Sequence, residues 1–253
     1  MESYATAQQI YAGALIFARM GSFLMTVPGI GDPSVPPRIR LAFAFVFTVM
    51  LVPVVAPVLP VIPGAVSAMA GAVIKEVLIG LMIGTILRLF LSSLAVAGEI
   101  ISIQTTLSFA QTSAPGIAPG STTLGTFLGL VGLVLIMSTG LHRMFITAIV
   151  NSYSLFPFTR PVPVADAAQM AVQTVSGSFK MGLQLSAPVA VFALIFNIAV
   201  GFVGRVMPQF QVYFVASPLM VIFGMSILAV SLGTIGMVWV DGYRVLLHQF
   251  GGT

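Results

Sequence analysis

Six long apolar segments alternate with short polar or proline-rich connectors along this chain. Each segment is near or above the roughly 20 residues that cross the hydrocarbon core of a bilayer as a helix. Because backbone polar groups find no water in hydrocarbon, and because the segments lack the alternation of a barrel strand, helices are the expected structure. The prediction is an all-α, integral membrane-type protein. The six segments cover residues 7–27, 41–62, 68–96, 124–150, 182–204 and 212–238.

Prolines and charges interrupt these segments. The first contains Arg19, the second contains Pro53, and the third contains Lys75, Glu76 and Arg88. Such residues are tolerated inside membrane helices where neighbouring helices or a water-lined cavity receive them. We therefore expect long, broken helices that pack on protein more than on lipid. Adjacent residues do not face each other on a helix, so Lys75 and Glu76 are expected to pair with other helices or with another chain.

The composition supports a membrane protein. The chain is 58% hydrophobic and only 6% charged, whereas a soluble domain carries about 25% charged residues. Cysteine is absent, which excludes disulfides, thiolate catalysis and cysteine-based metal sites. No basic cluster interleaved with aromatic residues occurs, so nucleic acid is not an expected partner. Without an internal repeat or a linker, residues 1–253 are predicted to form one domain.

The stretch "GIGD", Gly29 to Asp32, matches a short signature of intramembrane aspartyl proteases. That chemistry needs two aspartates that share a proton inside adjacent spans. Here Asp32 precedes Pro33 in a proline-rich connector, and Asp166 and Asp241 fall in loop and tail positions. A turn explains these glycines better than a protease site.

Other enzyme and cofactor signatures are also missing from the sequence. His142 and His248 are the only histidines, and they do not form a metal-binding pair. No glycine-rich loop leads into Lys75 or Lys180, so a phosphate-binding cradle is not expected. We therefore predict no enzyme activity, no metal and no cofactor. Any process that this chain supports would take its energy from another protein or source.

Two pairs of glycines lie four residues apart on predicted helices, Gly80 with Gly84 and Gly125 with Gly129. Small residues at this spacing let two helix backbones approach closely. Generic helix packing and a specific contact both remain open, and both predict contact between helices.

An uncharged stretch, "LSFAQTSAPGIAPGSTT" (107–123), follows Glu99 and Gln104. A carboxylate in an apolar run must be protonated, paired or wetted, so Glu99 marks either a helix end at a wet gap or an ion pair between helices. Prolines stop helix growth across the stretch, glycines allow unusual backbone angles, and an aromatic side chain could seal a pore. Its candidate residues are Leu107, Phe109, Gln111, Pro115, Gly116, Pro119 and Gly120.

Several phrases together resemble one family over nearly the whole chain. They are "RMGSFLMTVPGIGDPSVPPRIRLAF", "KEVLIGLMIG", "AGEIISIQTTLSFAQTSAP", "GLHRMFITAIVNSYSLFP" and "APVAVFALIFNIAVGFVGRVMPQFQVYFVASPL". The chain is similar to the R-subunit family of the bacterial flagellar export gate and its injectisome relatives in type III secretion. The most specific matches are Asn197, Gly201, Arg205, Pro208, Gln209 and Pro218.

The resemblance implies a structural pore or gate subunit that passes unfolded flagellar proteins. Family members join P and Q subunits in a bundle of helical hairpins, with an FlhB-like switch-type export subunit at its base. A loop of this subunit closes the channel as a plug, and it maps here to about 107–121. Family members often have Asp-Pro where this chain has Ala114 and Pro115. The implied location is the bacterial inner membrane, multi-pass, within the flagellar basal body, which makes the lipid bilayer a partner.

Under this interpretation, we give hypothetical roles to three groups of residues. Glu99, Gln104 and the 107–121 loop would form the gate. The expected inter-subunit ion pairs involve Lys75, Glu76 and Arg88. A subunit-facing break between two long helices would include Arg205, Pro208 and Gln209. Asn197 is a further candidate interface residue. The alternative is a secondary transporter that moves a small solute through broken helices around Glu99 and Asn197.

Overall fold

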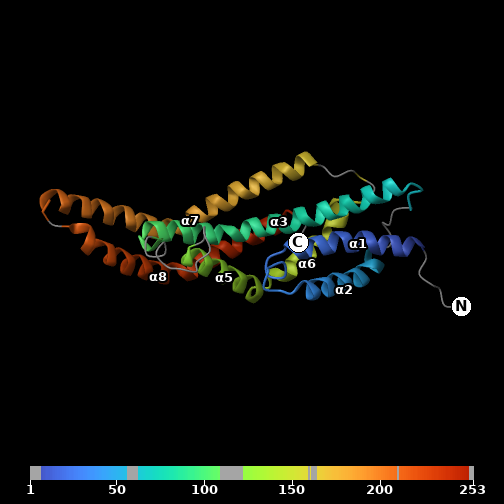
Figure 1. The fold of residues 1–253 in the computed structure, drawn as a ribbon, viewed down its shortest axis with the longest axis horizontal. Helices are drawn as coiled ribbons and strands as arrows, with labels where there is room; N and C mark the ends of the chain where they lie inside the picture. Colours follow the sequence, from blue (N-terminus) through green and yellow to red (C-terminus); the bar gives the residue numbers. More distant parts are fainter. Residues whose placement is uncertain are drawn as a thin grey trace. The chain divides into compact units, whose positions relative to one another are not determined.

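A computed structural model describes residues 7–55, 62–108, 122–158, 160, 164–209 and 211–250. The described residues form helices and connecting turns without a strand, which confirms the all-α prediction. The helices are α1 (Ala7–Thr26), α2 (Pro37–Val55), α3 (Val66–Gln104), α5 (Thr123–Ser138), α6 (Leu141–Leu155), α7 (Val164–Val206) and α8 (Val212–His248) (Figure 1).

The chain divides into two compact units, and each is built from separate stretches of sequence. The first unit contains Met1–Phe90, Gly140–Val175 and Arg244–Thr253, and the second contains Leu91–Thr139 and Ser176–Tyr243. Helices α3, α7 and α8 each contribute residues to both units. The expectation of a single domain over residues 1–253 stays a prediction.

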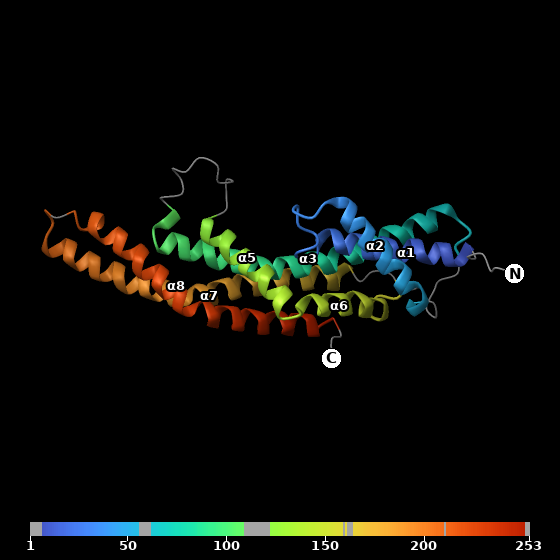
Figure 2. The same cartoon turned by 90° about the horizontal axis from the view of Figure 1, so that it is seen from below.

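Helix α1 is the clearest amphipathic element of the first unit. Its buried side chains recur every four residues in two adjacent rows, which forms one stripe along the helix. Figures 1 and 2 both show α1 and α2 side by side, joined by the proline-rich turn. The core of this unit includes Leu15, Ile16, Met20 and Phe23 of α1, Ile79, Ile83, Ile86 and Leu87 of α3, and Phe145 and Ile149 of α6.

The second unit is built from the end of α3, from α5, and from most of α7 and α8. Figures 1 and 2 show the last part of α7 beside the first part of α8, as expected of a helical hairpin. Phe192 of α7 lies against Phe223 of α8 with ring centroids 6.0 Å apart. Trp239 is fully buried, and its indole Nε1 donates to Ser93 Oγ at 3.0 Å. These contacts tie α3, α7 and α8 together within the unit.

The number of apolar helices is lower than the six segments suggested. Within the described residues, α2, α3, α7 and α8 are long and apolar enough to cross a membrane, and the broken pair of α5 and α6 could supply a fifth span. Helix α1 is not among them: it carries Gln8 and Gln9 in its first turn and Arg19 near its middle. The 124–150 segment divides because Gly140 adopts a left-handed conformation, with φ of 77°.

Prolines are accommodated inside three helices. Pro53, Pro188 and Pro218 lie within α2, α7 and α8 respectively. These three helices therefore continue through their prolines, and the break between α5 and α6 lies at Gly140 instead. Pro57 and Pro60 lie outside the described residues.

Candidate functional site

A buried cluster around Arg19 occupies the first unit. The Arg19 guanidinium donates from Nε to Glu76 Oε2 at 2.6 Å, from Nη1 to Ser152 Oγ at 3.0 Å and from Nη2 to the Phe156 carbonyl at 2.8 Å. Arg19 is 0% exposed and Glu76 is 1% exposed. The two charges therefore neutralise each other away from water, and charge-assisted bonds of this kind are the strong ones. We call Arg19, Glu76, Ser152 and Phe156 the Arg19 cluster.

Aromatic rings complete the surroundings of this guanidinium. Its central carbon lies 4.2 Å from the ring centroid of Tyr153 and 5.5 Å from that of Phe158. Such contacts add cation–π attraction when the cation is shielded from water. Burial, followed by the negative charge of Glu76, raises the pKa of Tyr11 on α1 above its ordinary value.

Lys75, the neighbour of Glu76 on α3, binds the chain just after α6. Its ammonium donates to the carbonyls of Pro157 and Phe158 at 2.9 Å each, and also to the carbonyl of Arg160. The Lys75 ammonium therefore holds the segment that follows the C-terminus of α6 against α3. Chemically, these contacts make a structural clamp between α1, α3 and α6.

An ion pair also forms at the proline-rich turn after α1. Arg88 Nη2 donates to Asp32 Oδ1 at 3.1 Å, and the Gly29 amide donates to Asp32 Oδ2 at 3.1 Å. Gly29 has φ of 87°, and a Cβ on Gly31 would lie 2.7 Å from the Val27 carbonyl oxygen. The "GIGD" stretch is thus a turn whose aspartate is bonded locally. This geometry supports the turn interpretation over the protease interpretation.

The close approach of α3 to α1 depends on Gly80 and Gly84. A Cβ on Gly80 would overlap Ser22 Oγ and the Arg19 carbonyl oxygen, and a Cβ on Gly84 would overlap Thr26 Oγ1. The first glycine pair therefore makes the helix contact expected of small residues at this spacing. In the second pair, only Gly125 is close to another helix, because a Cβ on Gly129 would meet nothing within 4 Å.

Four residues of the second unit hold the two helices that flank the 107–121 loop, and we call them the loop frame. Thr106 Oγ1 lies 3.2 Å from Ser217 Oγ on α8, so the end of α3 is held on α8. A Cβ on Gly98 would lie 2.6 Å from the Gly125 Cα, so the start of α5 is held on α3. Thr106 has φ of 60°, an uncommon conformation for a residue with a Cβ.

The residues predicted for the gate fall only partly within the structure. Glu99 is half-buried on α3, and its Cγ would lie 3.4 Å from a Cβ on Gly125. Gln104 is the last residue of α3, and Leu107 follows shortly after it. The remaining candidates lie outside the described residues: Phe109, Gln111, Pro115, Gly116, Pro119 and Gly120.

The predicted interface residues separate into two groups. Lys75, Glu76 and Arg88 have partners in their own chain. These partners lie in the segment after α6, on α1 and in the turn after α1, respectively. Pairing of these three residues with another subunit stays a prediction. The second group is exposed at the end of α7 and in the turn after it: Asn197, Arg205, Pro208 and Gln209.

Arg19 and Asp32 stand out in the sequence as charged residues, but the sequence does not indicate that Arg19 pairs with Glu76 or that Asp32 pairs with Arg88. Their partners lie 57 and 56 residues away along the chain. The scarcity of charged residues was the sequence signal that could have indicated these pairs, because a buried charge in an apolar segment requires an opposite charge. Among the described residues, no group of three or more His, Asp or Glu side chains could hold a metal ion.

The similarity of this chain to known proteins extends over nearly its whole length. Residues 10–245 match the family described as "Bacterial export proteins, family 1". The chain is 58% identical over 250 residues to the flagellar biosynthetic protein FliR of Caulobacter vibrioides, which covers 99% of this chain and 100% of that protein. The proteins of the same name from Aquifex aeolicus and Escherichia coli are 29% and 28% identical, over 99% and 83% of this chain and 96% and 80% of their own lengths.

Proposed function

We propose, because this chain belongs to family 1 of the bacterial export proteins, that it is a gate subunit of a flagellar protein export pore. Its role as a membrane component of the flagellar export apparatus follows from the family and from the apolar helices. The finer proposal is that the 107–121 loop plugs the channel through which unfolded flagellar proteins pass. The chain then acts as a structural part of the pore rather than as an enzyme.

The observation that carries the plug assignment is the packed loop frame, whose residues hold the helices on both sides of the uncharged 107–121 stretch. Thr106 and Ser217 hold the helix before the loop, and Gly98 and Gly125 hold the helix after it. A plug must stay in register with the channel that it closes, so its two ends need fixed supports. The segment itself lacks charged residues, and an uncharged segment costs little to move out of water into a narrow channel.

Glu99 belongs to the same gate. Its half-buried side chain lies beside the first turn of α5, which has no acidic residue of its own. A carboxylate near a helix N-terminus interacts favourably with the unpaired backbone N–H groups there. We propose that Glu99 fixes the start of α5, where the loop returns.

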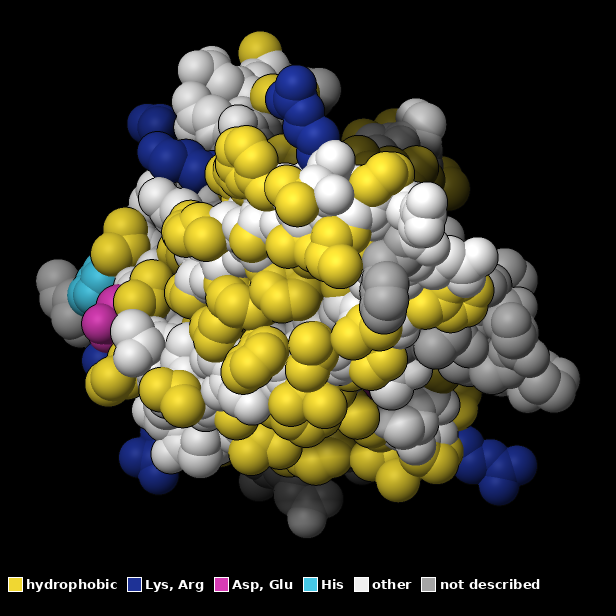
Figure 3. Space-filling view, turned by 90° about the vertical axis from the view of Figure 1, so that its left-hand side faces the viewer, with side chains coloured by type: hydrophobic (Ala, Val, Ile, Leu, Met, Phe, Trp, Pro, Cys, Tyr) yellow, Lys and Arg dark blue, Asp and Glu magenta, His cyan; other side chains and the backbone are white. Residues whose placement is uncertain are grey.

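The partners proposed for this chain are the P and Q subunits and an FlhB-like switch-type subunit. The surface of the α7–α8 hairpin supports an assembly role, because hydrophobic side chains are abundant in the view from this side (Figure 3). Apolar surface of this extent marks interaction with protein or lipid. Exposed residues near the turn include Leu194, Ile198, Phe202, Phe214 and Leu219. The proposed location is the inner membrane, within the flagellar basal body.

Deletion of residues 108–120 tests the plug. We expect constitutive leakage of ions across the membrane, measured with a potential-sensitive dye, in cells that still assemble the apparatus. Replacement of the same residues by a Gly/Ser stretch of equal length keeps the chain length and is expected to leak less than the deletion. An intact seal, combined with loss of uptake of a small solute only, would favour the transporter alternative and overturn the pore assignment.

A further inference from the structure

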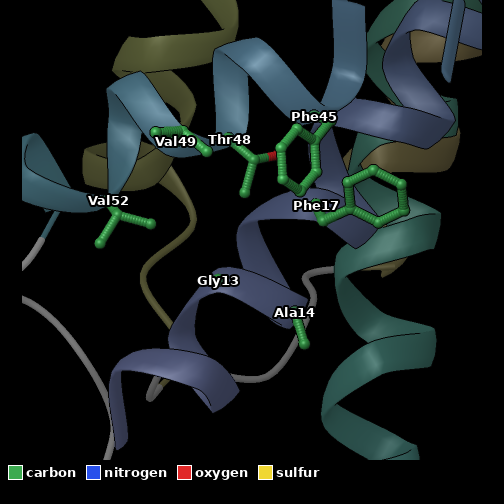
Figure 4. Close-up of a pocket in the computed structure, with 7 residues that line it drawn as sticks. All are labelled: Gly13, Ala14, Phe17, Phe45, Thr48, Val49 and Val52. Atoms are coloured by element: carbon green, nitrogen blue, oxygen red, sulfur yellow. The ribbon is translucent and has the colours of Figure 1, made fainter. Parts of the chain in front are cut away.

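An apolar groove lies between α1 and α2 in the first unit (Figure 4). Its volume is about 390 Å³, within the range of roughly 300–1,000 Å³ that is typical of ligand pockets. Gly13 and Ala14 leave α1 without large side chains on one side, and Phe17 lies near Phe45 at one end (Figure 4). The other lining residues are Thr48, Val49 and Val52.

The groove offers no polar group to a ligand. Thr48 is its only residue with a polar side chain, and its hydroxyl donates to the Ala44 carbonyl at 2.6 Å within α2. The methyl group of Thr48 is therefore the part that can face an occupant. The chemistry fits a hydrocarbon chain rather than a polar solute.

An exposed cation lies on the side of α2 that lines the groove. Arg38 is exposed, and its guanidinium has no hydrogen bond or ion pair with any described residue. Arg40 is different, because its Nε and Nη2 donate to the Val35 carbonyl at 3.1 and 3.0 Å. Phe45, Val49 and Val52 follow Arg38 by seven, eleven and fourteen residues, so all four residues share one helix face.

The spacing between this cation and the groove matches one leaflet of a bilayer. With a rise of about 1.5 Å per residue, the lining residues of α2 lie about 10 to 21 Å along the helix from Arg38. Half of a hydrocarbon core of about 30 Å is about 15 Å. Helix α2 is apolar and long enough to cross a membrane. A phosphate bound at Arg38 would therefore place an acyl chain at the depth of the groove.

We propose that the α1–α2 groove and Arg38 form a binding site for an anionic phospholipid. The guanidinium binds the phosphate, with the paired donor geometry that suits phosphate oxygens. One acyl chain lies in the groove against Gly13, Val49 and Val52. This inference is independent of the proposed pore function, because it concerns residues of the first unit alone.

The test uses the full chain in phosphatidylcholine nanodiscs that contain phosphatidylglycerol with a photoreactive group at the end of one acyl chain. After illumination, mass spectrometry is expected to find the label on peptides of α1 and α2 that line the groove. Unlabelled phosphatidylglycerol should compete about fivefold better than phosphatidylcholine, as expected for one added cation near the lipid headgroup. Arg38→Gln should abolish this preference, whereas Arg143→Gln, at another exposed arginine of the same unit, should retain it.

A second variant tests the acyl chain separately from the headgroup. A Cβ on Gly13 would meet nothing within 4 Å, so the larger side chain of Gly13→Leu is expected to occupy the groove and to reduce labelling. Gly21→Leu, at an equally open glycine of α1 that does not line the groove, is the matched control. Equal competition by the two lipids, labelling only outside α1 and α2, or displacement by inorganic phosphate would each overturn the proposal.

Discussion

Arg19 of α1 and Glu76 of α3 form an ion pair with an Nε to Oε2 distance of 2.6 Å, and both side chains are buried. Glu76 supplies the negative charge, while Ser152 and the Phe156 carbonyl take up further donors of the guanidinium. Removal of either partner would leave the other charge buried without water or an opposite charge to stabilise it, and this strongly destabilises the folded protein. The pair therefore fixes which helices meet in the first unit.

Removal of Glu76 is the first prediction. Glu76→Leu leaves the Arg19 charge buried without its partner and is expected to lower the free energy of unfolding by about 3–5 kcal/mol. The double variant Arg19→Met/Glu76→Leu removes both charges and should recover most of that loss. The measurement is the unfolding midpoint of the purified protein in detergent, followed by the loss of the monodisperse gel-filtration peak after heating.

The exposed pair is the matched control for this prediction. The side chains of Arg88 and Asp32 are 46% and 19% exposed, and their separation is 3.1 Å. Because solvent screens such a pair, Arg88→Gln should cost only about 0–1 kcal/mol. If Glu76→Leu proves as mild as Arg88→Gln, the Arg19 cluster does not have the stabilising role assigned to it.

The α1–α3 contact predicts that alanine substitutions at two glycines of α3 change the stability of the protein in opposite directions. Gly80→Ala brings a methyl group against the Arg19 carbonyl oxygen, a backbone atom that cannot rotate away, and should destabilise the chain by about 1–3 kcal/mol. Gly71→Ala meets nothing within 4 Å and should stabilise α3 by about 0.5–1 kcal/mol. Opposite shifts in the unfolding midpoint are expected. Shifts of the same sign would contradict the assigned packing.

The sequence predicted the helices better than their ends. Apolarity identified residues 182–204, but α7 covers Val164–Val206. The first turns of α7 contain Ala, Gln and Ser, so they continue the helix but are less apolar than the rest of it. Hydropathy also joined α5 and α6 into one segment. The break between them depends on the backbone of Gly140, and a single left-handed residue does not alter an average over about 20 residues.

The sequence predicted which residues of the candidate site need a partner, but it did not predict which residues those partners are. Scarce charges in apolar segments identified Glu76 and Arg88 as residues that need a partner. Their partners, Arg19 and Asp32, lie more than 50 residues away and are brought close only by helix packing. The contact between Gly98 and Gly125 likewise could not be read from either glycine alone, because it depends on the position of two helices.

Lys75 gives a prediction about the segment after α6. Lys75→Met keeps the length of the side chain but removes the ammonium that binds the Pro157 and Phe158 carbonyls. Each lost bond to a charged donor is worth about 1.5–3 kcal/mol. Hydrogen–deuterium exchange is therefore expected to accelerate in peptides that cover 152–158.

The other lysine of the chain is the control. Lys180 is exposed on α7 in the second unit, and Lys180→Met should leave exchange in peptides that cover 152–158 unchanged. Equal exchange in both lysine variants would show that the ammonium does not hold this segment.

The last prediction links the loop frame to the proposed gate. Gly98→Ala places a methyl group 2.6 Å from the Gly125 Cα, and both partners are backbone, so α3 and α5 must separate at a packing cost of about 1–3 kcal/mol. Gly129→Ala, on the outer side of α5, meets nothing within 4 Å. In cells with matched amounts of tagged protein, Gly98→Ala should raise ion leakage and reduce secretion of flagellar proteins, while Gly129→Ala should match the unchanged chain. Normal leakage and secretion in a stably folded Gly98→Ala variant would mean that the packing of these two helices does not position the plug.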